Sequence, residues 1–168
     1  VRALWRTMNG VSLKTFSNVR WWSKWEVLHQ LSVCWPLVKQ FVECNQLNSA
    51  YSQRLRDLIN DHGNTLVLEL AAAVDACECI VKATYNLEGD GFLVPDVYNA
   101  LACVSAHIDA FRVGKHPNLR AVALQLYPGD AEAREGAIEY GKQCAVPGFN
   151  YFTRRIMVGM STTVSLFE

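Results

Sequence analysis

Three tryptophans and two basic residues gather within six positions near the start of the chain. They are Arg20, Trp21, Trp22, Lys24 and Trp25. An indole ring beside a cation, when both lie on a loop, is suited to stacking an unpaired nucleobase while the cation binds its phosphate. The same cluster also fits a tryptophan corner that packs a loop onto the first long helix, which is the commoner use of buried tryptophan. Both interpretations stay open on residue chemistry alone.

Helix signals around the cluster indicate where these side chains lie. Ser23 is followed by Glu26 three residues later, and this spacing of a capping box predicts a helix that begins at Ser23. Residues 20–22 are then expected in the loop before the helix, and Trp25 in its first turn.

A second set of candidates is acidic and consists of Asp75, Glu78 and Asp90. Such carboxylates are the ligands of two-metal phosphoryl-transfer sites, and Asp75 and Glu78 share a helix face because they are three residues apart. Ligands of that kind are usually held by strands, however, and the sequence predicts no sheet. A solvated helix face is therefore the preferred interpretation of these residues.

The cysteines and histidines give no clear chemical site. None of the six cysteines forms a pair with the two-residue gap of a zinc or redox motif. Cys77 and Cys79 are close in sequence, but residues two apart on a helix point in different directions and do not easily ligate one ion. We expect free, buried thiols and no metal site. His62 and His116 are expected at helix ends, beside terminal carbonyls.

Two stretches of the chain resemble segments of a known family. Residues 17–27, SNVRWWSKWEV, resemble the Thr-Arg-Trp segment of hAT superfamily transposases and of the cellular proteins derived from them. Residues 82–91, KATYNLEGDG, and 94–98, VPDVY, resemble the later family segment in which one helix ends and the next begins. The two stretches have the family's order and approximate spacing.

The resemblance implies a fold and a role. In that family the segment follows the first two catalytic carboxylates of an RNase H-like domain and opens an all-helical insertion that separates them from the third. The arginine and tryptophan that open the insertion, thought to steady DNA at the active site, correspond to Arg20 and Trp21. Val19 stands where the family usually has threonine, so a hydroxyl contact made there is lost.

Composition is that of a globular domain. With 168 residues, of which 51% are hydrophobic, the chain can bury the core of a single domain over residues 1–168. It starts at Val1 rather than at a methionine, and we expect an excerpt of a longer transposase-like protein. No apolar run approaches the length of a membrane span, and no signal-peptide pattern opens the chain.

Charge is balanced overall but uneven along the chain. Sixteen basic and sixteen acidic residues give zero net charge, which argues against nonspecific polyanion binding by the whole chain. Residues 1–39 contain six basic residues and one acidic residue, whereas residues 57–96 contain one basic and eight acidic residues. A basic first part could face nucleic acid while an acidic middle faces solvent or a basic partner. Ordinary solvated faces explain both equally well.

Helical periodicity dominates the chain. Residues 1–22 are expected to form an arm and loop that include a short helix, and helices are expected over 23–35, 36–44 and 49–60, the last ended by residues 62–64. The strongest apolar period has members at steps of three or four: Leu66, Leu70, Val74, Cys77, Val81 and Tyr85. It predicts a central helix over 65–88. Further helices are expected over 95–113, 119–127, 131–144 and 149–157.

The predicted fold class is therefore all-α, an irregular bundle of about seven or eight helices around one long central helix. We expect the helical insertion region of an hAT-type transposase-like nuclear protein, in which Arg20, Trp21, Trp22 and Lys24 contribute contacts to DNA ends. DNA is the expected partner, in the full-length protein, with a homo-oligomer as a second one and no membrane.

No catalytic carboxylate can be placed in this chain, so we expect no enzymatic activity, no metal site and no cofactor, although the parent enzyme would need Mg²⁺ or Mn²⁺. A different hypothesis is a helical protein-interaction module of a domesticated transposon-derived protein. Its partner surface would be the acidic middle and the helix over 65–88.

Overall fold

The computed structural model describes residues 2–15, 17, 21–44, 50–88 and 94–154. Throughout these residues the regular secondary structure is helical, with no strand among them, which confirms the predicted all-α class. The helices are α1 (Arg2–Asn9), α2 (Trp21–Val33), α3 (Trp35–Glu43), α4 (Ala50–Leu87), α5 (Val94–Arg112), α6 (Pro117–Leu126) and α7 (Ala131–Phe152). Within the described ranges no helix is long and apolar enough to cross a bilayer.

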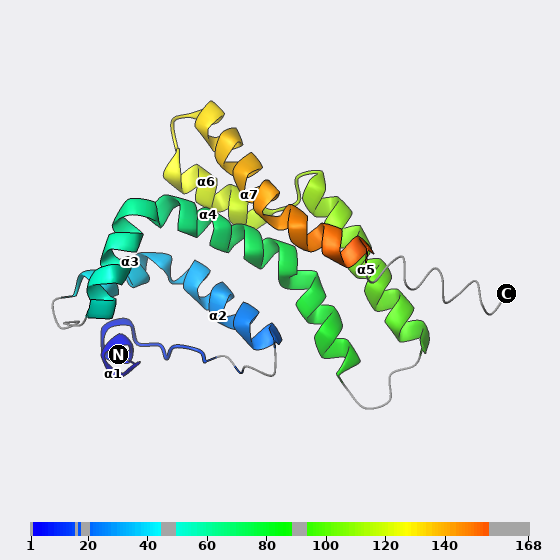
Figure 1. Ribbon diagram of the computed structural model, residues 1–168, viewed down its shortest axis with the longest axis horizontal. Coiled ribbons are helices and arrows are strands. Elements are labelled where there is room, and N and C mark those ends of the chain that lie inside the picture. Colours follow the sequence, from blue (N-terminus) through cyan, green and yellow to red (C-terminus); the bar gives the residue numbers. More distant parts are fainter. Residues whose placement is uncertain (1, 16, 18–20, 45–49, 89–93, 155–168) are drawn as a thin grey trace.

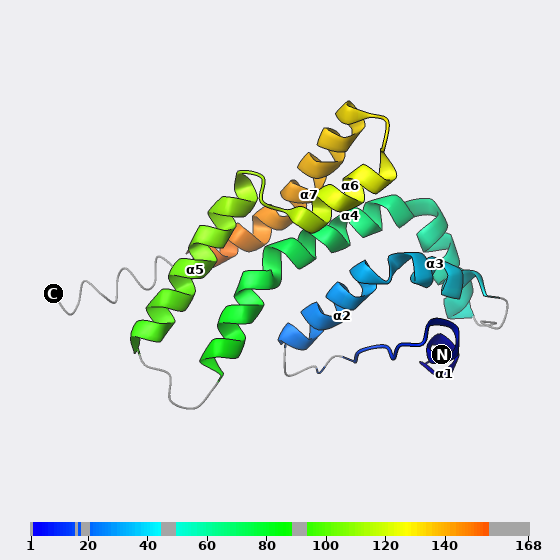
Figure 2. The ribbon, with the colours of Figure 1, turned by 180° about the vertical axis from the view of Figure 1, so that it is seen from behind.

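The helices form two layers with α4 between them (Figure 1). The first layer, α1 to α3, lies on one side of α4, and α6 and α7 lie on the other, with α5 beside the C-terminal half of α4. The view from behind shows the same arrangement (Figure 2). α4 packs against α2, α3, α5, α6 and α7. The long central helix that the sequence predicts is therefore present.

α4 continues through the point at which the sequence predicts a break, residues 62–64, and spans 38 residues. Gly63 is buried, and an added Cβ there would make ordinary van der Waals contacts, 3.7 Å from Ile59 Cγ2 and 3.9 Å from Lys39 Cε of α3. Burial of Ile59 and Val67 on either side offsets the roughly 1 kcal/mol that a glycine costs inside a helix. The expected break is wrong because tertiary packing outweighs local propensity.

α7 likewise continues through Pro147 and Gly148, where a second break is expected. Phe149 and Phe152 are buried in a cluster with Phe111 of α5, and Phe149 meets Phe111 edge-on with ring centroids 5.2 Å apart. This burial favours a continuous helix despite the missing proline N–H. Two pairs of expected helices, one pair in α4 and one in α7, are thus each a single continuous helix, so the described residues contain fewer separate helices than the stretches expected from the sequence.

α4 is buried on more than one face. One buried line follows steps of seven residues through Val67, Val74 and Val81. Another face packs against α6 and α7 in a cluster made of Leu68, Ala71, Ala72, Leu119, Ala123, Ala137 and Ile138. Further along α4, a cluster with α5 and α7 is made of Ala76, Val104, Ile108, Phe111, Phe149 and Phe152. Leu70, predicted to be a core residue, is only half-buried.

A third cluster joins the first turns of α4 to α1 and α3. It contains Trp5, Phe41, Val42 and Ile59. Arg56 of α4 reinforces it, because its Nε donates to the Val42 carbonyl oxygen at 2.7 Å. The same guanidinium donates to the Cys44 carbonyl oxygen at 3.1 Å, so it binds carbonyls that the end of α3 leaves unpaired.

A buried aspartate of α4 caps the N-terminus of α6. Asp75 is 2% exposed, and its carboxylate accepts from the backbone N–H groups of Asn118 at 3.2 Å and Leu119 at 2.9 Å. The Asn118 side-chain amide donates to it at 2.6 Å. These backbone groups have no intrahelical acceptor, and the N-cap residue, His116, supplies no side-chain bond. Asp75 therefore does not belong to a solvated face, and that interpretation is wrong.

Loss of this cap should be costly. Asp75→Ala leaves buried donors at the start of α6 without an acceptor, and we expect it to lower the free energy of unfolding by about 2 to 4 kcal/mol. Asp61→Ala, at an exposed position of the same helix, should change it by less than about 0.5 kcal/mol. Urea denaturation measures both values, and equal effects would contradict the capping role.

Substitution by alanine should change the stability of the fold in opposite directions at two glycines of α7. An added Cβ at Gly141 would lie 2.5 Å from Cδ1 of the fully buried Leu119, so Gly141→Ala should destabilise the fold by about 1 to 3 kcal/mol. Gly136 has no atom within 4 Å of such a Cβ, so Gly136→Ala should stabilise by about 0.5 to 1 kcal/mol. Thermal melting of the two variants checks the signs.

Candidate functional site

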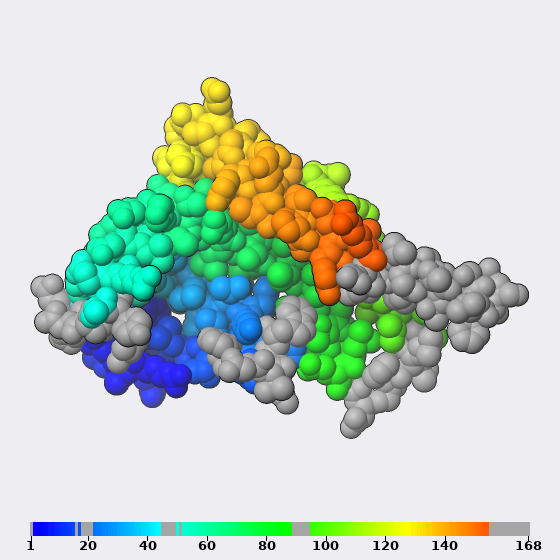
Figure 3. All heavy atoms as spheres, in the orientation of Figure 1, coloured from blue at the N-terminus to red at the C-terminus, as the bar shows by residue number. Residues whose placement is uncertain are grey.

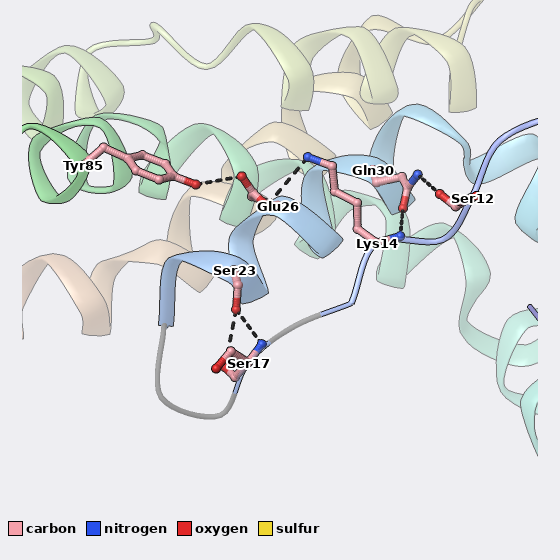
Figure 4. Close-up of polar contacts among 7 residues, drawn as sticks. All are labelled: Ser12, Lys14, Ser17, Ser23, Glu26, Gln30 and Tyr85. Carbon is pink, nitrogen blue, oxygen red and sulfur yellow. Dashed lines mark hydrogen bonds and ion pairs between the residues drawn. The ribbon is translucent and has the colours of Figure 1, made fainter. Parts of the chain in front are cut away.

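The segment before α2 lies along that helix as a strap, defined here by residues 12–15 and 17 (Figure 4). The Lys14 backbone N–H donates to Gln30 Oε1 at 2.6 Å, and Gln30 Nε2 donates to the Ser12 carbonyl oxygen at 2.8 Å. Near the start of α2, Ser23 Oγ accepts from the Ser17 N–H at 2.8 Å and donates to the Ser17 carbonyl oxygen at 3.3 Å. The strap thus runs antiparallel to α2 and is fixed at both ends.

These contacts overturn the predicted capping box. α2 begins at Trp21, so Ser23 lies inside the helix, buried against the strap. Glu26 Oε1 accepts from the Tyr85 hydroxyl of α4 at 2.7 Å, and Glu26 Oε2 lies 3.7 Å from Lys14 Nζ. Both members of the expected box have partners on other segments. Residues 21 and 22 therefore belong to the helix and not to the loop before it.

Two tryptophans of the cluster pack α2 onto α4. The Trp22 ring lies against Tyr85 with centroids 4.7 Å apart, and its Nε1–H donates to Glu88 Oε1 at 2.8 Å. Trp25 Nε1–H donates to the Val74 carbonyl oxygen at 3.2 Å. The contacts of Trp22 and Trp25 are therefore those of a packing corner, the interpretation in which the tryptophans pack segments of the chain together and do not stack on nucleobases.

The other members of the predicted DNA site are Arg20, Trp21 and Lys24. Lys24 is exposed on α2. Arg20 is not among the residues that the structure describes. Trp21 is the first residue of α2, and its side chain is not described either. Arg2 and Arg6 of α1 are also exposed. Within the described part of the chain, none of Arg2, Arg6 and Lys24 forms an ion pair.

The acidic residues in the second half of α4, and Glu88 just after it, are engaged within the molecule, whereas Asp61 in the first half is exposed. Between residues 69 and 88 the acidic residues are Glu69, Asp75, Glu78 and Glu88. Tyr140 OH donates to Glu69, the first turn of α6 donates to Asp75, Lys82 Nζ lies 2.6 Å from Glu78 Oε1, and Trp22 donates to Glu88. The negative charge of this stretch is therefore largely used in internal contacts, while the exposed cations of α1 and α2 remain available.

The cysteines are all free, which confirms that part of the prediction. None is fully buried, so the expectation of buried thiols is wrong. Cys77 lines a cleft beside α7, whereas Cys79 packs against the cluster with α5, so the two thiols have different surroundings. Partial burial is the main cause that raises the pKa of both thiols.

The two histidines expected at helix ends have different outcomes. His116 Nδ1–H donates to the Phe111 carbonyl oxygen at 3.2 Å, near the end of α5, which confirms that prediction. His62 is exposed in the interior of α4, so the expectation for it is wrong.

Sequence reasoning missed the partners that hold the start of α2. Gln30, Tyr85 and Glu88 carry the contacts to the strap and to Trp22. Tyr85 lies on the predicted apolar line of the central helix, and that position is a usable signal for packing. Gln30 and Glu88 have no sequence signal, because their partners are 16 and 66 residues away.

Comparison with known proteins leaves the family undetermined: no family model, no curated protein and no solved structure matches this chain.

The Trp22 contact can be tested by stability. Trp22→Ala should lower the free energy of unfolding by about 1 to 3 kcal/mol, because it removes the ring contact with Tyr85 and the bond to Glu88. Trp22→Phe keeps a ring and should cost about 1 kcal/mol. Lys24→Ala, at the exposed position two residues later, is the control and should change stability by less than about 0.5 kcal/mol. A Trp22→Ala variant as stable as the control would show that the contact is unimportant.

Proposed function

We propose that this chain is the helical insertion region of an hAT-type transposase-like nuclear protein, in which the start of α2 contributes contacts to DNA ends. Arg20 and Trp21 are the residues proposed to touch DNA, with Lys24 beside them. Trp22 would position this segment by packing onto α4. The catalytic carboxylates and their Mg²⁺ or Mn²⁺ would belong to other parts of the parent protein, so the chain alone would not cleave DNA.

The observation that carries this proposal is a contact between the two stretches that resemble the family. Trp22 lies in the first stretch, residues 17–27, and its ring and N–H meet Tyr85 and Glu88 of the second stretch, residues 82–91. The end of α4 at Leu87 and the start of α5 at Val94 fall within the second resemblance, where one helix is expected to end and the next to begin. Stretches that are distant in sequence thus form one local structure.

Charge gives independent support. The exposed cations Arg2, Arg6 and Lys24 lie in the layer formed by α1 to α3, where they form no ion pair with described residues. Exposed, unpaired lysine and arginine side chains are available to phosphate groups. A role in DNA contact is therefore compatible with this surface, although the net charge of the whole chain is zero.

The alternative of a protein-interaction module gains no comparable support. Its partner surface would be the acidic part of α4, but α4 lies between the two layers (Figures 1 and 2). Its carboxylates between residues 69 and 88 have partners within the chain. Asp75 in particular cannot serve a basic partner, because it is buried and its carboxylate caps α6.

The test compares DNA affinity and stability for Trp21→Ala in the parent protein. If Trp21 stacks an unpaired base, its loss should weaken binding to DNA with an unpaired end by about 1 to 3 kcal/mol and hardly change the melting temperature. Arg20→Ala and Lys24→Ala should each reduce the salt dependence of binding by about one released counterion, on intact and distorted DNA alike.

Arg112→Ala on α5 is the matched control for charge. Its side chain is exposed and lies 3.5 Å from Asp109, and we expect no change in the salt dependence of DNA binding. A large fall in melting temperature for Trp21→Ala with unchanged DNA affinity would contradict the proposal and would assign Trp21 to the packing corner. Mg²⁺-dependent or Mn²⁺-dependent nuclease activity of the isolated chain would contradict the absence of catalytic carboxylates.

A further inference from the structure

A cleft of about 230 Å³ lies between α4 and α7, where the two core clusters of these helices meet. α7 crosses α4 on the face of the molecule that Figure 3 presents. Small side chains line the cleft, among them Ala73 and Ala76 of α4 and Ala145 and Gly148 of α7. An added Cβ at Gly148 would meet no atom within 4 Å, so the cleft is open because small residues leave volume unfilled.

The cleft has a charged end and an apolar end. Glu69 lies at one end, and Ile80, with Phe149 of α7, lies towards the other. Ile80 is eleven positions after Glu69 in the helix, which corresponds to about 16 Å along the axis. Among the described lining residues, no other side chain is charged. The cleft therefore offers one carboxylate at the head of an apolar surface.

The carboxylate of Glu69 is held in place by a neighbour on α7. Tyr140 OH donates to Glu69 Oε1, and this bond, followed by burial, raises the pKa of Tyr140. The phenol thus remains the donor and Glu69 the acceptor. A carboxylate oxygen accepts more than one hydrogen bond, so Glu69 can also accept from a bound cation.

We propose that this cleft binds a small amphiphilic amine, with its ammonium group paired to Glu69 and its apolar body lying towards Ile80 and Phe149. A charge-assisted hydrogen bond beside apolar walls is stronger than the same bond in water, and an anionic ligand would be repelled. The cleft is smaller than the roughly 300 to 1,000 Å³ of sites for drug-sized molecules, which limits the ligand to about one aromatic ring with a short aminoalkyl chain.

The cysteines of the chain provide a probe of occupancy. Cys144 is exposed and lines the cleft, whereas Cys103 is exposed on α5 and is not among the lining residues. A bound ligand should slow alkylation of Cys144 by iodoacetamide and leave the rate at Cys103 unchanged. Mass spectrometry of the two peptides gives both rates from one sample, and Cys103 serves as the internal control.

The ligand series is 2-phenylethylamine, its neutral analogue 2-phenylethanol and the anion phenylacetate. We expect the amine to bind with Kd on the order of 10⁻³ M and to slow Cys144 alkylation about tenfold at ten times Kd. The alcohol should bind about tenfold more weakly, and phenylacetate should give no protection. Equal protection by the three compounds, or none by the amine, would overturn the proposal.

Three variants test whether the protection of Cys144 arises from ligand bound in this cleft. Gly148→Leu should fill the cleft and abolish protection, while Gly136→Leu, on the same helix with open space around it, should leave protection unchanged. Glu69→Gln keeps the shape and should remove the preference for amine over alcohol, so it decides the question if Gly148→Leu does not fold. Protection that survives Gly148→Leu, or an amine preference that survives Glu69→Gln, would contradict the site.

Discussion

Burial of α4 on two faces at once is the constraint on which the rest of the structure depends. Val74 and Asp75 are adjacent in the chain, yet they serve different layers: the Val74 carbonyl oxygen accepts from Trp25 of α2, and the Asp75 carboxylate caps α6. One turn of helix thus fixes both layers. Because a buried carboxylate needs donors, α6 must begin at this point of α4, and α7 is then positioned by its packing on both helices.

This arrangement also explains what could be predicted from the sequence. The apolar line through Val74 and Val81 is strong in sequence and is buried, so the central helix and the all-α class could be predicted. The burial of a second face of α4 was not predicted, because Ala71 and Ala72 add little to an apolar pattern and Asp75 is a residue type usually found at the surface. All three residues are buried. Alanine and a hydrogen-bonded carboxylate are buried because other elements pack against them. The periodicity of a single sequence carries no information about those elements.

The tryptophan cluster illustrates the same limit at the candidate site. Residue types alone left a base-stacking surface and a packing corner open. The distances place both Trp22 and Trp25 in the packing corner: Trp25 donates its N–H to Val74 of α4, and Trp22 packs on Tyr85 of α4 and donates to Glu88 just after that helix. Ser23 and Glu26 matched a capping box in sequence, but their partners are the strap and Tyr85. Local spacing predicted that a helix starts here, whereas the long-range contacts decide which of its side chains pack onto α4.

Native-state hydrogen exchange tests the central role of α4 most directly. If both layers depend on this helix, the amides of residues 67–81 should exchange only through global unfolding, with free energies equal to that from denaturant titration. The amides of α1 should exchange through local opening at a lower free energy, because a single buried residue, Trp5, anchors that helix. Exchange of residues 67–81 at a lower free energy than the amides of α6 or α7 would contradict the account.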